Sequence, residues 1–294
     1  MPTALVTGGL GTFGSRAVRS LATDDWAVAC IDQVPPPTPE AAPECVTFYT
    51  VDLTDRGDAL ELIRSVDPDV VVHTAAMLDP PYNAVLLESN VTSTTNACLG
   101  AGRAGADIVA ISSTSALGTS KAERPWLPEY LPVDEAHECR PEDPYGTSKL
   151  VGEEVVAMVA RRHDVSAVSL RPSWLQIPGE YPVLDLQDRE VGRNGLFWTY
   201  LDVRDAVAGV RAAMRVDSGG HEACYLVADD NCMGRPTKDL VAEGYGELPD
   251  QCDLSDEAPG FSNAKAQELL GWEPEHSWRT AAEESANTPG FVQS

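Results

Sequence analysis

The chain has 294 residues, of which 46 are acidic and 21 basic, and its formal net charge is −25. So acidic a surface repels polyanions, which argues against nucleic acid or an anionic membrane as a partner. The seven cysteines are scattered and form no Cys-x-x-Cys pair, and no basic, apolar leader or long apolar stretch is present. We therefore expect a reduced, cytoplasmic protein.

Acidic residues occur along the whole chain and are not gathered in a tail. This distribution favours adaptation to high salt, because dissolved ions screen the repulsion between carboxylates. An acidic protein that works at ordinary salt is the alternative. The five histidines lack the spacing of metal ligands, so we expect no metal.

Apolar runs and helical segments alternate from the N-terminus to about Pro172. This alternation predicts an α/β fold with a doubly wound parallel sheet, and runs such as Val70-Val71-Val72 suit strands that are covered on both faces. The predicted strands are 4–7, 27–31, 47–51, 70–73, 108–112 and 167–171, and the predicted helices are 12–22, 55–66, 84–104 and 145–161. Proline-rich segments at 35–39 and 122–144 are expected to be loops. We expect a nucleotide-binding domain over residues 1–172 and a smaller, interleaved substrate lobe over 173–294.

The first predicted strand runs into Thr7-Gly-Gly-Leu-Gly-Thr-Phe-Gly14, which opens a helix. A strand, a glycine turn and a helix bring backbone N–H groups to a pyrophosphate. Gly8 permits the tight turn, Gly11 lets the phosphates approach, and Gly14 lets the helix pack on the strand. Asp32 ends the second strand, where a carboxylate accepts hydrogen bonds from both hydroxyls of an adenine ribose and repels a 2′-phosphate. The pattern predicts NAD in preference to NADP.

Tyr145 and Lys149 stand four residues apart in Pro144-Tyr-Gly-Thr-Ser-Lys149. On a helix they share one face, so the ammonium is expected to lower the pKa of the phenol and to bring its proton into catalytic range. A hydroxyl at the end of the fifth strand can bind the same substrate oxygen. Ser113 is our choice for this third catalytic residue, and Thr114 is the alternative.

Further landmarks follow in order: Val51-Asp-Leu53, His73-Thr-Ala-Ala76, Asn90, Leu170-Arg-Pro172, Tyr200-Leu-Asp-Val-Arg-Asp205 and Leu270-Gly-Trp-Glu-Pro274. From about Thr3 to Trp278 the chain resembles the extended short-chain dehydrogenase/reductase family, the NAD-dependent epimerase/dehydratase group. The resemblance implies a Rossmann fold, bound NAD and catalysis by Ser113, Tyr145 and Lys149. The cofactor contacts that it implies are Gly8, Gly11, Thr12, Phe13, Gly14, Asp32, Asp52, Leu53, Thr74, Ala75, Ala76, Asn90, Tyr145 and Lys149.

Two absences guide the choice of reaction within this family. Sugar 4,6-dehydratases place Asp-Glu after the catalytic hydroxyl, where this chain has Thr114-Ser115, so dehydration is not expected. Nucleotide-sugar epimerases carry a long segment where this chain has only the short stretch 173–199, between Pro172 and Tyr200. We therefore expect a dehydrogenase of a small free sugar or uronate, which passes hydride from C1 to NAD. A nucleotide-sugar epimerase with tightly bound NAD is the first alternative, and a non-catalytic NAD-binding regulator is the second.

The expected substrate contacts are Thr114, Ser115, Arg193 and Trp174. Arg193 lies five residues before Trp198, where similar uronate dehydrogenases place an arginine that grips the substrate carboxylate. An ordinary surface arginine is the alternative. Trp174, Trp198 and Tyr200 either wall a sugar pocket or belong to the core, and the core is the preferred interpretation for all three, because large aromatic residues are more often buried. Arg204 and Asp205 are expected to pair structurally. We expect a homodimer or larger homo-oligomer that acts on a small-molecule sugar.

Overall fold

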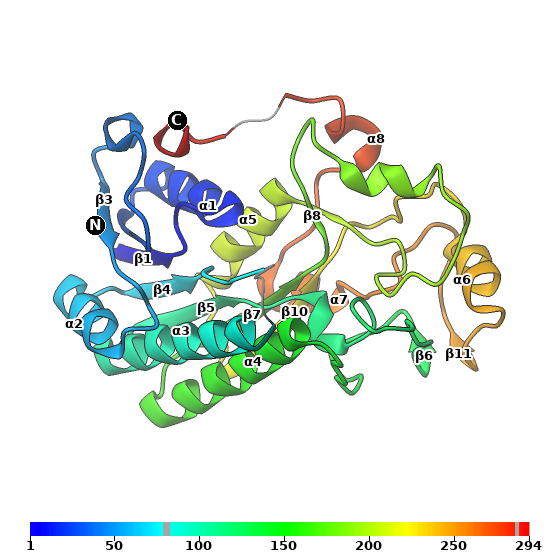
Figure 1. Cartoon of the computed structure of the whole chain (residues 1–294), viewed down its shortest axis with the longest axis horizontal. Helices are drawn as coiled ribbons and strands as arrows, with labels where there is room; N and C mark the ends of the chain where they lie inside the picture. Colours follow the sequence, from blue (N-terminus) through cyan, green and yellow to red (C-terminus); the bar gives the residue numbers. More distant parts are fainter. Residues whose placement is uncertain (79–82, 286–287, 294) are drawn as a thin grey trace.

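A computed structural model describes residues 1–78, 83–285 and 288–293, and its centre is a seven-stranded parallel sheet (Figure 1). The strand order is β10-β7-β5-β4-β1-β2-β3, and every neighbouring pair is parallel. The strands are β1 (Thr3–Thr7), β2 (Ala27–Asp32), β3 (Val46–Thr50), β4 (Val70–His73), β5 (Asp107–Ile111), β7 (Ala167–Pro172) and β10 (His221–Leu226). The predicted doubly wound Rossmann sheet is confirmed.

Helices cover both faces of this sheet. One face carries α1 (Thr12–Thr23), α5 (Val203–Ala213) and α7 (Ala264–Leu270), and the other carries α2 (Arg56–Val66), α3 (Asn83–Ala104) and α4 (Pro144–His163) (Figure 1). The strands and helices predicted as far as Pro172 all form, and their ends differ by two positions at most. None of the described helices has the length and hydropathy that crossing a membrane requires.

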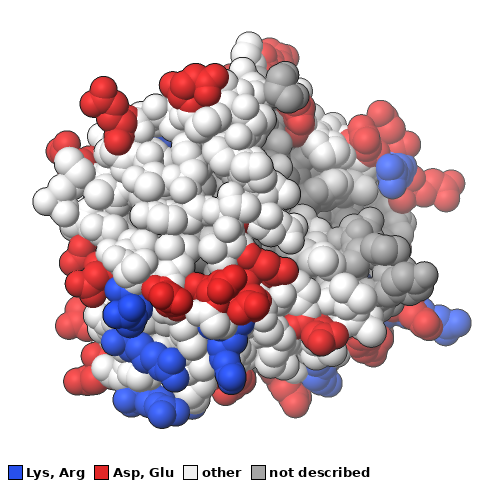
Figure 2. All heavy atoms as spheres, turned by 60° about the vertical axis from the view of Figure 1, so that its left-hand side comes forward, with Lys and Arg blue, Asp and Glu red and all other residues white. Residues whose placement is uncertain are grey.

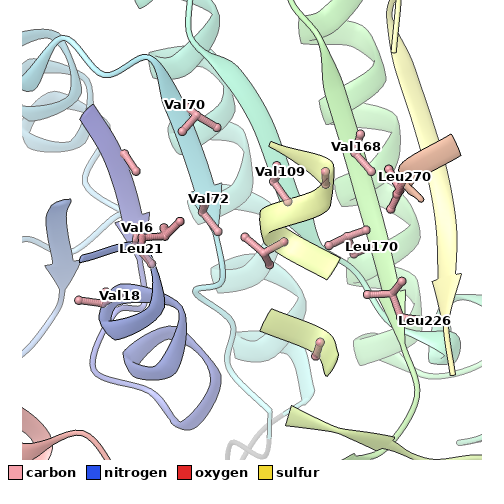
Figure 3. Packing of buried hydrophobic residues seen from close by; sticks show 14 of the residues in the cluster. Val6, Val18, Leu21, Val70, Val72, Val109, Val168, Leu170, Leu226 and Leu270 are labelled. Atoms are coloured by element: carbon pink, nitrogen blue, oxygen red, sulfur yellow. The ribbon is translucent and has the colours of Figure 1, made fainter. Parts of the chain in front are cut away.

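The alternation of side chains along each strand explains the two layers of core. Val70 and Val72 of β4 pack with Val18 and Leu21 of α1, as Figure 3 shows, whereas Val71 points to the opposite layer. Because both faces are covered, valine can occupy successive positions of the strand. This burial holds the carboxyl ends of the strands at one rigid edge.

Most of the remaining elements form a lobe beside that edge (Figure 1). They are β6 (Tyr130–Leu131), β8 (Leu175–Gln176), β9 (Leu201–Asp202), β11 (Gln251–Cys252), α6 (Thr237–Tyr245), α8 (Trp278–Ala281) and the 3₁₀ turns η2 (Thr114–Leu117) and η3 (Pro182–Leu186). Trp198 and Tyr200 are buried in its core, as expected. The predicted loop at 122–144 contains β6, which pairs with β11.

Arg204 and Asp205 do not pair with each other, contrary to expectation. Arg204 binds Asp202 and Glu284, while Asp205 accepts a hydrogen bond from the backbone of His276 and contacts its ring. Both residues still tie α5 to later parts of the chain. Their side chains diverge because adjacent residues on a helix lie about 100° apart around its axis.

The end of the chain returns to the first half of the sheet. Near it lie the 3₁₀ turns η1 (Pro39–Ala41) and η4 (Gly290–Val292). The rings of Phe291 and Phe48 lie 5.6 Å apart, and Thr38 Oγ1 donates a hydrogen bond to the carbonyl oxygen of Gln293 at 2.6 Å. The tail therefore covers part of β3, the edge strand.

Candidate active site

The glycine turn between β1 and α1 has a backbone that larger residues do not allow. Gly8 has a φ of +64°, and a Cβ on Gly14 would lie 2.1 Å from the carbonyl oxygen of Gly8. Thr74 Oγ1 braces the end of β1 by donating a hydrogen bond to the carbonyl oxygen of Thr7 at 2.6 Å. The N-terminus of α1 is thus open at the carboxyl edge of the sheet, which suits a diphosphate.

A cavity of about 390 Å³ runs from this turn along the ends of β1, β2 and β4. Nine of the predicted cofactor residues line it: Gly8, Gly11, Asp32, Asp52, Leu53, Thr74, Ala75, Ala76 and Asn90. Thr12, Phe13 and Gly14 belong to the first turn of α1 and are not part of that lining. A helix N-terminus and the Asp32 carboxylate in one cavity fit a dinucleotide whose ribose has a free 2′-hydroxyl.

Asp32 supports a prediction about cofactor choice. Its Oδ2 accepts a hydrogen bond from the backbone N–H of Leu10 at 3.0 Å, which fixes the carboxylate in the cavity. Asp32→Ala is expected to reduce the preference for NAD over NADP by at least about tenfold, because repulsion of the 2′-phosphate is removed. The measurement is kcat/KM with each cofactor, and Asp188→Ala on the exposed surface is the control. An unchanged ratio would show that Asp32 does not select the cofactor.

Tyr145 is held beside η2 by the start of α4. Asp143 caps this helix by accepting hydrogen bonds from the N–H groups of Tyr145 and Gly146, both at 2.9 Å. A Cβ on Gly146 would lie 2.4 Å from the carbonyl oxygen of Ser115, so glycine allows α4 to approach η2 closely. The phenol consequently reaches Ser113, with which it forms a hydrogen bond.

The pKa of Tyr145 moves opposite to the direction that the sequence predicts. Burial raises it above its usual value, and the hydrogen bond with Ser113 opposes this rise. The ammonium of Lys149 lies 5.7 Å from the centre of the Tyr145 ring. The expected lowering is therefore wrong for this geometry, because burial removes the phenolate from water and the negative charge of Asp143 adds to the rise in pKa.

The pKa of Lys149 is also shifted from its usual value. Burial lowers the pKa of its ammonium to about 8, and the negative charge of Glu153 opposes this effect. Its Nζ donates a hydrogen bond to the carbonyl oxygen of Ile111 at 2.8 Å. Lys149 therefore loses its positive charge at mildly alkaline pH.

The sequence analysis missed Glu153. It lies one helical turn beyond Lys149 on the same face of α4, and both of its carboxylate oxygens bind the guanidinium of Arg171, at 2.8 and 2.6 Å. Ser112 also donates a hydrogen bond to Glu153. This buried network joins α4 to β7 and the end of β5, next to the predicted catalytic residue Lys149. The signal was available, since Glu153 continues the four-residue spacing of Tyr145 and Lys149.

Lys121 is the second residue that was missed. It is an exposed loop residue, and its ammonium lies 5.1 Å from the centre of the Tyr145 ring. The chain contains only four lysines, at 121, 149, 238 and 265, and two of them approach Tyr145. The scarcity of lysine was the available signal.

The predicted substrate residues lie in different environments. Trp174 follows β7 and is 41% exposed, so the preferred interpretation of Trp174 as a core residue is wrong and its ring is accessible. The guanidinium of Arg193 lies 5.5 Å from the ring centre of Tyr245 and donates a hydrogen bond to the carbonyl oxygen of Pro125. Thr114 and Ser115 belong to η2 and are buried, and Ser115 Oγ accepts a hydrogen bond from Ser120. Their substrate roles remain predictions.

The model of the NAD dependent epimerase/dehydratase family matches residues 4–184. The chain belongs to this family. Membership confirms the predicted family and NAD as the cofactor, and it makes the protein an NAD-dependent enzyme of the oxidoreductase and epimerase type.

Known relatives extend the likeness to the rest of the chain. The UDP-glucose 4-epimerase of Rhizobium meliloti is 25% identical over 96% of this chain and 95% of its own length. That of Azospirillum brasilense is 31% identical, but the match spans 62% of this chain and about half, 51%, of the relative. The crystal structure of UDP-glucose 4-epimerase from Thermotoga maritima with UDP-glucose is 22% identical, covers 96% of both chains and has a TM-score of 0.71. At this identity the structural likeness establishes the fold alone.

Proposed function

We propose that this enzyme is a nucleotide-sugar epimerase, which oxidises one carbon of a sugar and reduces it again from the other face. The grouping of Ser113, Tyr145 and Lys149 carries this proposal, together with the hydrogen bond that joins Asn90 of the cavity that suits NAD to Ser148 of the same helix, α4. The relatives favour epimerisation over the free-sugar dehydrogenase that the short segment before Tyr200 predicts, since both are UDP-glucose 4-epimerases.

Each of the three side chains has a separate role in the reaction of one substrate hydroxyl. Ser113 holds the reacting hydroxyl, and Tyr145 removes its proton and later returns it. Lys149 brings a positive charge that favours the phenolate and offers its ammonium to the ribose of the cofactor. NAD, held by the residues of the cavity, would supply the acceptor and donor of the hydride.

Positive charge near Tyr145 supports an anionic substrate. The ammonium of Lys121 lies 5.1 Å from the Tyr145 ring centre, and Arg193 binds Pro125 four residues further along the same loop. In a chain with net charge −25, one cation beside this loop and another bound to it are suited to a diphosphate or a carboxylate. A nucleotide sugar supplies the first group and a uronate the second.

A uronate dehydrogenase is the second candidate, and the packing of residues 173–199 favours it. Tyr181, Val183, Phe197 and Trp198 are buried in the core of the lobe. This short segment therefore leaves few side chains to form a nucleotide pocket. A free sugar acid is smaller than a nucleotide sugar, so its binding pocket needs fewer side chains. One cation is enough to bind its carboxylate.

One pair of assays separates the two candidates. The enzyme is given UDP-galactose or UDP-glucose and the products are resolved by chromatography; in parallel it is given free uronates with NAD and NADH absorbance is followed. The proposal expects interconversion of the UDP-sugars without accumulation of NADH. Sustained NADH formation from a uronate, with no UDP-sugar conversion, would replace it with the second candidate. Activity in neither assay, in both low and high salt, would reject both substrate classes.

A further inference from the structure

A second cavity lies between α1 and α5, on the face of the sheet opposite α3 and α4. Its volume is about 470 Å³, and none of the predicted catalytic or cofactor residues lines it. Figure 1 shows the two helices side by side above the sheet. Any ligand of this cavity is therefore distinct from the substrate and NAD.

Arginines dominate the polar lining of this cavity. Arg16 and Arg19 come from α1, and Arg204 and Arg211 come from α5. Each pair occupies one helix face, since the residues are three and seven positions apart. Four of the chain's 21 basic residues thus meet in one cavity of a protein that has 46 acidic residues.

Two of these arginines, Arg204 and Arg211, form ion pairs with acidic residues. Arg204 binds Asp202 and Glu284, of which Glu284 also lines the cavity, and Arg211 pairs with Asp24 through Nη2. Arg16 instead donates to the carbonyl oxygen of Thr12 in its own helix, at 2.7 Å. Burial and the like charge of Arg19 lower the pKa of Arg16, and the negative charges of Glu180 and Asp202 oppose this effect.

One donor in the cavity wall is buried and unused. Among the described residues, Arg211 Nε is inaccessible to solvent and has no hydrogen-bond partner. Because solvent does not reach this atom, a ligand in the cavity meets the accessible part of the Arg211 side chain, which is 37% exposed, and not Nε itself. Arg211 and Arg16 both line the cavity and offer an oxyanion positive charge.

The rest of the lining is apolar. Pro178, Val203, Val207 and Ala208 line the cavity together with the arginines. A cavity of several hundred Å³ with an apolar wall and a few charged groups suits a small organic molecule better than a bare ion. Inorganic phosphate would leave that wall without contacts.

We propose that this cavity is a binding site for an organic phosphate. The phosphate group binds Arg16 and Arg211, and the organic part of the ligand packs on the valines of α5. The site goes beyond the proposed function, because it shares no residue with the active site.

Phenyl phosphate is the probe, since it combines a phosphate with a small apolar body. Binding is measured by calorimetry at constant ionic strength with saturating NADH, which keeps the cofactor site filled. Two matched probes serve for comparison: inorganic phosphate lacks the apolar ring, and phenol lacks the phosphate group. We expect phenyl phosphate to bind at least about tenfold more tightly than either, because both halves contribute contacts.

Arg16→Gln is the test variant, since it removes one charge without breaking a described ion pair, and Arg16→Gln with Arg211→Gln is the stronger form. Each variant is expected to bind phenyl phosphate at least about tenfold more weakly than the unmodified protein, while its affinity for NADH is retained. Arg189→Gln, on the exposed surface, is the control and should bind as the unmodified protein does. Three results would overturn the proposal: no saturable binding, equal affinity for inorganic phosphate, or binding that Arg16→Gln leaves unchanged.

Discussion

Replacing Tyr145 with phenylalanine is expected to reduce turnover by at least about 10²-fold, the range that a positioned acid or base contributes. The change removes one oxygen and leaves the ring between Lys121 and Lys149. NADH affinity should stay within about twofold, since the cavity that suits the cofactor is lined by other residues. Turnover is measured with the active substrate class, and NADH binding by fluorescence. Tyr49→Phe, on β3, is the matched control.

The pH profile gives this experiment a second readout. Because the pKa of Tyr145 is raised, the phenolate fraction grows as the pH rises above neutrality. The pKa of Lys149 is about 8, so its supporting charge is lost above that pH. Oxidation by the unmodified enzyme should accelerate from neutral pH towards about 8 and then flatten. A Phe variant with more than about a tenth of the normal rate would show that another group moves the proton.

Thermal stability is expected to rise when KCl is increased from about 0.1 M to about 2 M. Even if each of the 21 basic residues paired with one acid, 25 of the 46 acidic residues would lack a cation (46 − 21 = 25). Figure 2 shows acidic side chains spread over the visible face, with Lys and Arg gathered mainly at its lower left. Folding brings these like charges together, so screening favours the folded state. The melting temperature measures this effect.

The shape of the salt response identifies its cause. The Debye length falls from ~10 Å at 0.1 M to ~3 Å at 1 M, so most of the gain from screening should appear below about 1 M. Sucrose is the control, because it stabilises folded proteins through exclusion from their surface without screening charge. A melting temperature that is flat or falls with KCl would refute the predicted adaptation to salt.

The sequence predicted those parts of the fold whose signals are local. Val70-Val71-Val72 specifies a buried strand, and the glycines from Gly8 to Gly14 specify a turn that the structure reproduces. The lobe was harder, because β8 and β9 have two residues each and form through pairing between distant segments. Elements this short carry no periodic pattern of their own.

The candidate site was predictable in its residues but not in its electrostatics. The spacing of Tyr145 and Lys149 places them on one helix face, as found. The upward shift of the Tyr145 pKa depends on how much of the chain surrounds the phenol, which no local pattern encodes. Lys121 likewise approaches Tyr145 because its loop folds back over α4, and its position in the sequence does not reveal this.

The return of the chain's end to β3 has a consequence for synthesis on the ribosome. When β7 has just emerged from the ribosome, it still lacks its outer neighbour β10, and Phe48 still lacks Phe291. An uncovered strand edge is open to pairing with other chains. A nascent chain paused at this length is therefore expected to be sensitive to proteases and to aggregation. The edge of β7 is covered only when β10 has been synthesised, and Phe48 of β3 only when Phe291 has been synthesised. Strands made early in translation therefore stay partly uncovered until much later segments emerge.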